Sequence, residues 1–400
     1  MNIIFFTLVE INSIEDRGIY TDLLRKFVNE GHQVTIVTPK ERRNGIKTNL
    51  LESRQVKILQ VKTLNIQKTN IIEKGVGTLA IEYQYLSAIK KLLSNEKYDL
   101  VLYSTPPITF TKVIKAIKRR FGAQSYLLLK DIFPQNAVDL EMMKPNGLLQ
   151  RFFRGKEKSL YSMSDYIGCM SPANVEYVLK HNPQIPADHV EVCPNSIDIN
   201  ITEDFIKDPY IRQKYNIPSN ATIFIYGGNL GKPQGLDFLL EVLEYNNGRQ
   251  DCFFIVIGSG TEQKKISDWF NTHIISNSIL LAGLPKGEYD QLVKACDVGL
   301  IFLDKRFTIP NYPSRLLSYL EYKMPVLVAT DENSDLGRIA EQNNYGLFSV
   351  NGDIEDFNSQ LNKLVGNQIL IKKMGENGYR FLMNNYTVSN SFKIIMNHFS

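Results

Sequence analysis

The sequence predicts an α/β protein with two domains, each a doubly wound parallel sheet, whose strand ends face a common cleft. Three observations predict this fold class. The 400 residues are 43% apolar and 22% charged, a globular composition with enough chain for two hydrophobic cores. Short apolar runs alternate with helical patterns, as in parallel sheets covered by helices. A polar stretch between residues 194 and 220 separates two such series.

The first series defines a domain at residues 1–200. The apolar run at residues 2–9 predicts a strand buried on both faces, and residues 19–29 carry apolar side chains at helical spacing until Gly31 ends the helix. Residues 33–38 supply the next strand and complete a βαβ unit. The same alternation predicts further strands and helices at residues 100–103, 110–120, 125–129, 166–170, 173–179 and 190–193.

The second series defines a domain at residues 201–385. It predicts strands at residues 222–226, 253–257, 279–281, 298–302 and 326–329. Helices are predicted between them at residues 236–245, 262–270, 288–295 and 314–322. A final helix is predicted at residues 388–399, and we expect the C-terminal segment 386–400 to pack back on the first domain. Ligands of open α/β sheets bind beyond the carboxyl ends of strands, so chemistry is expected in the loops that follow strands.

Composition and cysteine usage narrow the class of protein. Apolar runs stay far shorter than the roughly 20 residues of a membrane span, and no basic segment precedes the first run, so we expect a cytosolic protein. Four widely spaced cysteines without metal-ligand spacing are expected to be reduced core residues. Residues 1–200 hold 27 Lys and Arg against 20 Asp and Glu, and the remainder holds 19 against 22. The basic half suits a phosphorylated ligand, anionic lipid or nucleic acid, or is only a solvated face.

Residues 226–235, Tyr-Gly-Gly-Asn-Leu-Gly-Lys-Pro-Gln-Gly, follow a predicted strand and precede a predicted helix. Backbone N–H groups in such a loop can hold a phosphate, and glycines let a ligand approach the main chain. We therefore expect Gly228 and Asn229 to contact a phosphorylated ligand and Lys232 to neutralise it. The P-loop and dinucleotide patterns both fail here. The alternative is an ordinary glycine turn with a solvated lysine.

A second candidate is the segment Pro313-Ser314-Arg315, which has the chemistry of a helix start with Ser314 as N-cap. A positive charge in the first turn opposes the helix dipole unless an anion lies nearby. We therefore expect this segment to border a phosphate. The alternative is a structural pairing of Arg315 with Glu321 or Asp304.

Two more strand ends carry candidate side chains. Ser259 follows the strand at residues 253–257, although a lone Gly-Ser-Gly often marks only a tight turn. Asp131 follows the strand at residues 125–129 and is a candidate for orienting an acceptor hydroxyl, with helix capping as the alternative. The sequence contains no readable Ser-His-Asp or Cys-His signature and no D-x-D motif for a divalent cation, so we expect chemistry without a metal.

Two predicted helices combine basic and apolar side chains and are candidates for lying on an anionic membrane. For residues 110–120 we favour the alternative, an ordinary helix that covers the sheet. For residues 148–158 both interpretations stay open; this segment places Arg151, Arg154, Lys156 and Lys158 around Leu148, Leu149, Phe152 and Phe153. Neither segment interleaves aromatic and base-reading side chains, so no nucleic-acid partner is expected.

The order of these segments resembles the GT-B glycosyltransferases, and within them the large retaining family 4. The resemblance covers essentially the whole chain. It rests on a loop reaching Gly18, on Gly31 to Thr38, Pro194 to Asp198, Gly228-Asn229-Leu230 with Lys232, Gly283, Ala295 to Gly299, and Pro313-Ser314-Arg315 before Met324-Pro325-Val326. It implies two Rossmann-like domains: an acceptor-side domain at residues 1–200, with Gly18 near the substrate, and a nucleotide-sugar donor domain at residues 201–385.

The chain departs from the family pattern at several positions. The two family glutamates that lie eight residues apart match Pro310 and Ser318, and the family Arg and Lys match Asn229 and Gln234, which leaves Lys232 to supply the charge. Residues 228–232 and 313–321 look most like the branch that transfers N-acetylfucosamine and related amino sugars in capsule and O-antigen assembly.

The resemblance implies a membrane-peripheral enzyme at the inner face of the plasma membrane. It would transfer an N-acetylated 6-deoxy amino sugar, such as N-acetyl-L-fucosamine, from a UDP-sugar to a polyprenyl-diphosphate-linked acceptor with retention of configuration. Lys232 and Arg315 would stabilise the leaving diphosphate, so no metal or other cofactor is expected besides the UDP-sugar substrate. Two alternatives stay open: a nucleotide-sugar epimerase of similar two-domain build, and a non-catalytic partner subunit.

Overall fold

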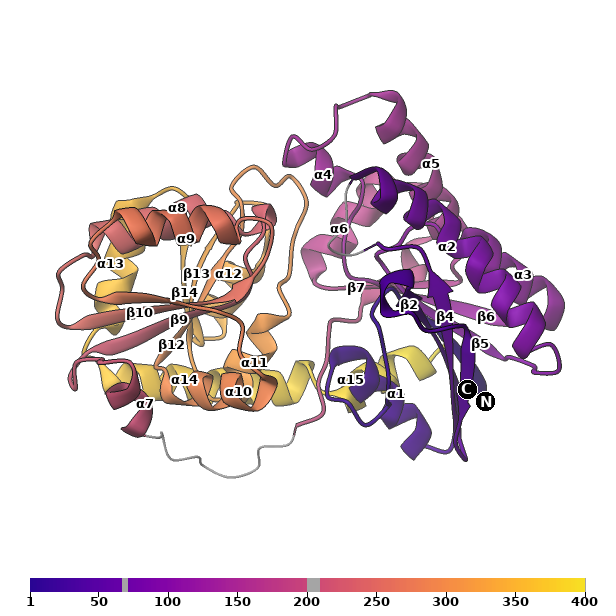
Figure 1. Cartoon of the computed structure of the whole chain (residues 1–400), viewed down its shortest axis with the longest axis horizontal. Helices are drawn as coiled ribbons and strands as arrows, with labels where there is room; N and C mark the ends of the chain where they lie inside the picture. Colours follow the sequence, from indigo (N-terminus) through magenta and orange to yellow (C-terminus); the bar gives the residue numbers. More distant parts are fainter. Residues whose placement is uncertain (67–70, 200–208, 400) are drawn as a thin grey trace. The chain divides into compact units, whose positions relative to one another are not determined.

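The computed structural model describes residues 1–66, 71–199 and 209–399 and contains two compact units (Figure 1). Unit 1 consists of Met1–Asp198 and Val388–Ser400, and unit 2 consists of Ile199–Thr387. The expected domain boundary between residues 200 and 201 lies outside the described residues. Each unit is built around its own largely parallel sheet, which confirms the predicted α/β fold class.

Unit 1 is built on an eight-stranded sheet. Its strands are β1 (Asn2–Phe6), β2 (Gln33–Glu41), β3 (Asn49–Glu52), β4 (Val56–Thr63), β5 (Leu100–Ser104), β6 (Gln124–Leu129), β7 (Tyr166–Cys169) and β8 (Val190–Val192). Their order across the sheet is β3-β4-β2-β1-β5-β6-β7-β8. All pairs are parallel except β3 with β4. Because later strands add on both sides of β1, the sheet is doubly wound.

Helices cover both faces of this sheet (Figure 1). They are α1 (Ile19–Asn29), α2 (Ile71–Leu92), α3 (Thr111–Phe121), α4 (Gln135–Asp139), α5 (Leu148–Met163), α6 (Pro172–His181) and α15 (Val388–Met396), with one-turn helices η1 (Arg42–Asn44) and η2 (Ala187–His189). Successive residues of β1 point to opposite faces. Ile4 and Phe6 pack with α2 and α3, whereas Ile3 and Phe5 pack with α1 and α15. The last helix of the chain is thus part of the core of unit 1.

The basic helix α3 is an ordinary sheet-covering helix, as we favoured. Its apolar side chains Val113, Ile114 and Ile117 are buried, and Lys118 forms an ion pair with Asp165 at 2.6 Å. The other basic side chains of α3 are exposed on a helix that is already packed against the sheet; they are Lys112, Lys115, Arg119 and Arg120.

Unit 2 is built on a six-stranded parallel sheet. Its strands are β9 (Thr222–Asn229), β10 (Cys252–Ser259), β11 (Ser278–Leu281), β12 (Val298–Phe302), β13 (Val326–Thr330) and β14 (Gly346–Val350). Its helices are α7 (Pro209–Lys214), α8 (Leu236–Tyr245), α9 (Gln263–Thr272), α10 (Lys286–Ala295), α11 (Arg315–Glu321), α12 (Leu336–Gln342), α13 (Ile354–Leu364) and α14 (Gln368–Asn385), with the one-turn helix η3 (Lys232–Gln234). The order β11-β10-β9-β12-β13-β14 reverses direction between β9 and β12. Such a reversal is where open sheets of this kind bind ligands.

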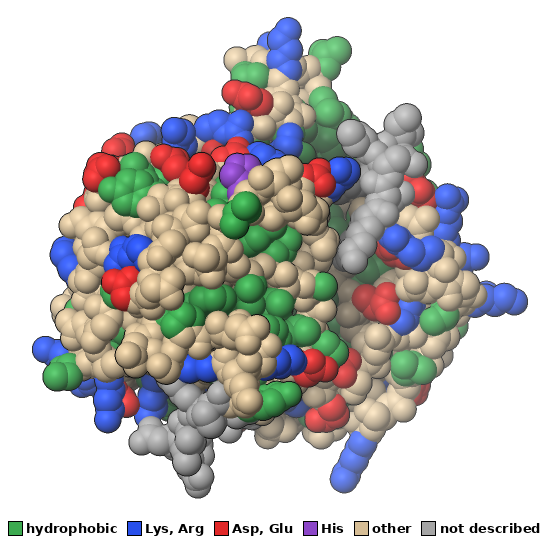
Figure 2. Space-filling view, turned by 60° about the vertical axis from the view of Figure 1, so that its left-hand side comes forward, with side chains coloured by type: hydrophobic (Ala, Val, Ile, Leu, Met, Phe, Trp, Pro, Cys, Tyr) green, Lys and Arg blue, Asp and Glu red, His purple; other side chains and the backbone are tan. Residues whose placement is uncertain are grey.

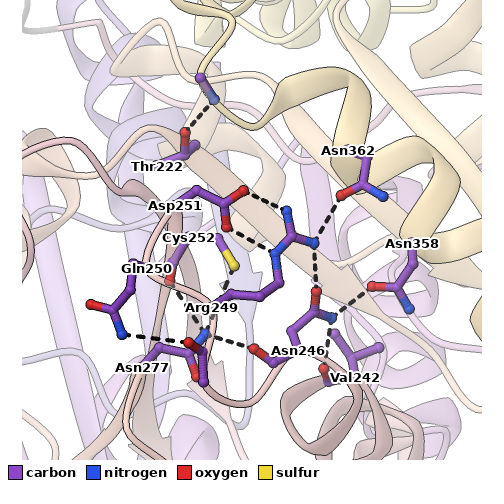
Figure 3. Close-up of polar contacts among 12 residues, drawn as sticks. Thr222, Val242, Asn246, Arg249, Gln250, Asp251, Cys252, Asn277, Asn358 and Asn362 are labelled. Atoms are coloured by element: carbon purple, nitrogen blue, oxygen red, sulfur yellow. Dashed lines mark hydrogen bonds and ion pairs between the residues drawn. The ribbon is translucent and has the colours of Figure 1, made fainter.

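A polar cluster lies near the amino end of β10 in unit 2 (Figure 3). Arg249 donates to both carboxylate oxygens of Asp251, at 2.8 and 2.9 Å, and to the side-chain oxygens of Asn246 and Asn362. Asn246 in turn donates to Asn358 of α13 at 2.6 Å. This cluster joins the end of α8, the start of β10 and α13, at the end of the sheet opposite to the carboxyl ends of its strands.

The cysteines and the lengths of the apolar helices bear on two further expectations from the sequence. The four cysteines are free and buried, as predicted. Among the helices that the structure describes, none is both long enough and apolar enough to span a membrane.

Candidate active site

The glycine-rich segment after residue 226 first continues strand β9 as far as Asn229, and the loop begins only at Leu230. Strands β9 and β10 stay paired as far as Gly228 opposite Gly258 and Asn229 opposite Ser259. The expectation that Gly228, Asn229 and Ser259 lie in loops is therefore wrong. Close approach of the two backbones explains the extension, because a Cβ on Gly258 would lie 1.8 Å from the carbonyl oxygen of Gly228.

A pocket of about 510 Å³ lies at the carboxyl ends of β9, β10 and β11. It is lined by Gly228, Asn229, Ile257, Gly258, Ser259, Gly283, Leu284, Lys286 and Tyr289. Three of the predicted ligand-binding residues, Gly228, Asn229 and Ser259, are thus brought together. The position of the pocket, beside the reversal of strand order, is the usual ligand position in a doubly wound sheet.

Arg315 lies next to this pocket although it does not line it. An ideal Cβ on Gly228 would be 3.8 Å from the guanidinium carbon of Arg315. The guanidinium stacks over the ring of Tyr226, 4.3 Å from its centroid, and Nη2 donates to Oε1 of Gln234 at 2.5 Å. Nη1 is buried without a hydrogen-bond partner among the described residues. Within the same described ranges no ion pair joins Arg315 to an acidic side chain, and Asp304 instead binds Arg306.

The start of α11 differs from the predicted helix cap. The helix begins at Arg315 and has seven residues. Ser314 precedes it with helical backbone angles, φ −65° and ψ −18°, and its side chain makes no capping hydrogen bond. The predicted capping by the Ser314 hydroxyl is therefore wrong, because this residue already follows the helical path. Ser314 is exposed, Pro313 is half-buried, and neither lines the pocket.

Lys232 also occupies a position that differs from the expected one. It begins the one-turn helix η3, and α8 starts four residues later, after Gly235 in the left-handed region at φ 57°. Residues 226–235 therefore lead into α8 at Leu236, as predicted, but Lys232 itself lies in η3, before the α-helix. Asp304 donates its backbone N–H to the carbonyl of Pro233 at 3.1 Å, which fixes η3 against the loop after β12. The Lys232 side chain is exposed and does not line the pocket.

The two candidates in unit 1 each have partners within that unit. The carboxylate of Asp131 accepts two hydrogen bonds from Nδ2 of Asn136, both at 2.9 Å. Burial raises the pKa of Asp131 to about 6, and the bond from Asn136 opposes part of this rise. The backbone N–H of Gly18, which precedes α1, donates to the buried carboxylate of Asp22 at 3.1 Å. Gly18 thus takes part in the start of α1.

Two tyrosines that were not predicted from the sequence contact Gly227 beside the pocket, and one of them, Tyr289, lines the pocket. The Tyr289 hydroxyl lies so close to Gly227 that a Cβ there would be 2.2 Å away, and burial raises the pKa of Tyr289 to about 12. The hydroxyl of Tyr319 accepts a hydrogen bond from the backbone N–H of Gly227 at 3.1 Å. This N–H has no partner in β12, because the pairing of β9 with β12 ends at Ile225. A tyrosine in a helical pattern gives no signal of such a role. Gly227 is the only indication in the sequence, because a strand glycine often marks a close approach.

Lys286 is a further missed pocket residue. It begins α10, and its ammonium group contacts both carboxylate oxygens of Asp290 at 3.1 Å. Its charge is thus already balanced, in contrast to that of Arg315. Across the part of the chain that the structure describes, no three His, Cys, Asp or Glu side chains form a cluster suited to a metal ion.

Comparisons with known proteins agree with this geometry. The model of the family "Glycosyltransferase Family 4" matches residues 19–201, and that of "Glycosyl transferases group 1" matches residues 207–381. The chain is 22% identical over 289 residues to the probable glycosyltransferase WbjE of Pseudomonas aeruginosa, covering 70% of this chain and 68% of that protein. It is 21% identical over 257 residues to the putative colanic acid biosynthesis glycosyl transferase WcaI of Escherichia coli, covering 61% of this chain and 60% of that protein.

Solved structures share the fold over almost the whole chain. Sucrose-phosphate synthase from Thermosynechococcus elongatus superposes with a TM-score of 0.75 at 12% identity, covering 99% of this chain and 98% of that one. The Anabaena protein HepE in complex with UDP-glucose gives a TM-score of 0.70 at 14% identity, covering 100% and 99%. The first half of the sequence matches one family model, the second half matches the other, and both units have the expected sheets. The chain therefore belongs to the group 1 and family 4 glycosyltransferases, with the GT-B fold.

Proposed function

We propose that this protein transfers a sugar, with retention of configuration, from a UDP-sugar to a polyprenyl-diphosphate-linked acceptor in bacterial polysaccharide assembly. The observation that carries the proposal is the guanidinium of Arg315, which lies beside Gly228 at the pocket and has no acidic partner among the described residues. A diphosphate is the part of a nucleotide sugar that such a group binds, because a guanidinium matches phosphate in both charge and geometry.

The comparisons support this substrate class. The HepE structure contains UDP-glucose, and the name of WcaI places that protein in colanic acid biosynthesis. We propose further that the sugar is an N-acetylated 6-deoxy amino sugar such as N-acetyl-L-fucosamine. Support for this comes from residues 228–232 and 313–321, which resemble the branch that acts on such sugars in capsule or O-antigen assembly.

The proposed reaction breaks the bond between the anomeric carbon and the β-phosphate oxygen, and the electron pair stays on UDP. Arg315 stabilises the charge that develops on this oxygen, with Lys232 and backbone N–H groups near Gly228 as further sources of positive potential. The acceptor hydroxyl forms the new bond to the same carbon and gives its proton to the departing phosphate oxygen. Asp131, in unit 1, orients that hydroxyl.

We also propose that α5 holds unit 1 on an anionic membrane. Leu148, Leu149 and Phe152 at its start are 86%, 58% and 45% exposed. Lys156 lies over the ring of Phe152, 5.7 Å from its centroid, and Arg151 is exposed beside it. Hydrophobic and basic side chains lie together on the projecting tip at the top of Figure 2, which carries the α4–α5 connection in Figure 1. Exposed apolar side chains with basic neighbours favour the surface of an anionic bilayer.

One residue of this helix does not belong to the membrane face. Arg154 forms an ion pair with the buried carboxylate of Glu157 and donates to the carbonyl of His181 at 2.9 Å. It therefore points into unit 1, and its charge is not available to lipid. Arg151 and Lys156 carry the proposed electrostatic contact.

The decisive experiment incubates the protein with a panel of UDP-sugars, with and without a polyprenyl-diphosphate-linked sugar acceptor, and follows products by mass spectrometry. We expect UDP release that depends on the acceptor, together with one added sugar mass on the lipid. Conversion of the donor without acceptor would instead identify an epimerase. Absence of both donor binding and turnover across the panel would favour the non-catalytic subunit.

A further inference from the structure

Gln234 is the residue that holds the guanidinium of Arg315 in place. Its side-chain oxygen accepts from Nη2 of Arg315 at 2.5 Å and from the hydroxyl of Tyr226 at 3.3 Å. Tyr226 also donates to the carbonyl of Asn229 at 2.8 Å, which connects this group to the lining of the pocket. Gln234 is itself buried, with 8% of its surface exposed. Because Tyr226 has a single hydroxyl proton and its shorter contact is to Asn229, Arg315 is the principal donor that orients the amide of Gln234.

The side-chain oxygen of Gln234 is a neutral acceptor, and its neutrality matters for the charge of Arg315. A carboxylate in the same position would bind the guanidinium more strongly but would also neutralise it. An amide oxygen fixes one N–H of Arg315 and leaves the positive charge available. The stack on Tyr226 fixes the plane of the guanidinium, and Gly228 contributes no side chain between this plane and the pocket.

We propose that Gln234 is a positioning residue: it orients Arg315 toward a bound diphosphate while leaving the charge of Arg315 uncompensated. This inference rests on the proposed function, since it concerns the same donor site. A purely structural role is the alternative. In that role Gln234 would stabilise η3, and the charge of the ligand would make no difference.

The test measures binding of UDP and of uridine by calorimetry to wild type, Gln234→Ala and Gln234→Glu. We expect Gln234→Ala to weaken UDP binding by about tenfold, the loss typical of a hydrogen bond to a charged group. Gln234→Glu should weaken UDP binding more than Gln234→Ala does, although it preserves the size and the acceptor of the native side chain. Uridine, which lacks the diphosphate, should bind all three proteins alike. Gln250→Glu, which makes the same charge change at the opposite end of the sheet (Figure 3), should bind UDP like wild type.

A double-mutant cycle with Arg315→Ala separates this inference from the proposed function. If Gln234 acts through Arg315, Gln234→Ala should cause no further loss of UDP affinity once Arg315 is alanine. Additive losses, equal weakening of uridine, or a Gln234→Glu protein that binds UDP as well as wild type would each overturn the positioning role alone. Unchanged UDP affinity in the single variant Arg315→Ala would overturn both this inference and the proposed diphosphate site.

Discussion

At the scale of single residues, the charge of Arg315 should matter far more to the reaction than to the fold. We expect Arg315→Ala to lower kcat/KM for the UDP-sugar by about tenfold to a thousandfold, because one charge-assisted contact is lost where charge develops. Steady-state kinetics measure this loss, and the melting temperature should change little. Lys232→Ala should fall at the lower end of the same range, since this side chain is exposed and lies outside the pocket lining. Full activity of the folded Arg315→Ala protein would contradict the assignment.

Asp131 carries a prediction about pH. Its folded pKa, raised by burial to about 6, lies above the value of about 3.9 expected in the unfolded chain. The folded state thus binds more protons between these values, and the contribution of this group to stability falls as pH rises through that window. We expect Asp131→Asn to raise the melting temperature relative to wild type more at pH 7 than at pH 4. In the same Asp131→Asn variant, sugar transfer should fall while UDP affinity stays intact. An equal shift in melting temperature at both pH values would rule out the titration of Asp131.

At the scale of elements, helix α5 should decide whether the protein binds membranes. Each basic residue near an anionic surface contributes about 1 kcal/mol, so Arg151→Glu with Lys156→Glu should strongly reduce co-sedimentation with anionic vesicles at low salt. The matched control is Lys372→Glu with Lys373→Glu, two exposed lysines of α14 in unit 2. If the α5 variant sediments like this control, the exposed apolar residues of α5 have another role.

The Arg249 cluster joins three elements of unit 2 and predicts an effect on stability alone. Arg249→Ala removes hydrogen bonds to Asp251, Asn246 and Asn362. We expect a loss of roughly 1 to 2 kcal/mol in the free energy of unfolding, a modest value because Asp251 is largely exposed to solvent. Denaturant unfolding measures the change, and calorimetry should find UDP affinity unchanged. A loss of UDP affinity without a loss of stability would indicate coupling to the pocket instead.

The local sequence predicted some elements closely and left others unseen. The bounds of α1, α8 and β12 equal the predicted ranges, because a one-sided apolar pattern or a short buried run specifies each of them. No element was predicted between residues 39 and 99, where β3, β4 and α2 lie. Helix α2 buries Ile81 and Tyr85 but exposes Leu79 and Tyr83, so its apolar residues do not mark a single face.

At the scale of the whole molecule, the proposed reaction should not depend on a divalent cation. The chain contains no D-x-D motif, and Arg315 already brings positive charge to the pocket. We therefore expect sugar transfer to continue in excess EDTA, measured as UDP release with acceptor present. Loss of turnover in EDTA with recovery on adding magnesium or manganese would show that a metal, in addition to Arg315, neutralises the diphosphate.

The two series of strands and helices, the α/β class and the positions of the glycines at the ends of β9 and β10 follow from the sequence, because periodicity and residue type are local properties. Which side chains meet at the pocket depends instead on how the strands are ordered in the folded chain. Gln234 and Arg315 are 81 residues apart in the chain, and they meet because β12 lies beside β9 in the sheet. The same strand order brings Tyr319 of α11 against Gly227. Contacts of this kind depend on how strands are ordered in space, a property that no short stretch of sequence encodes.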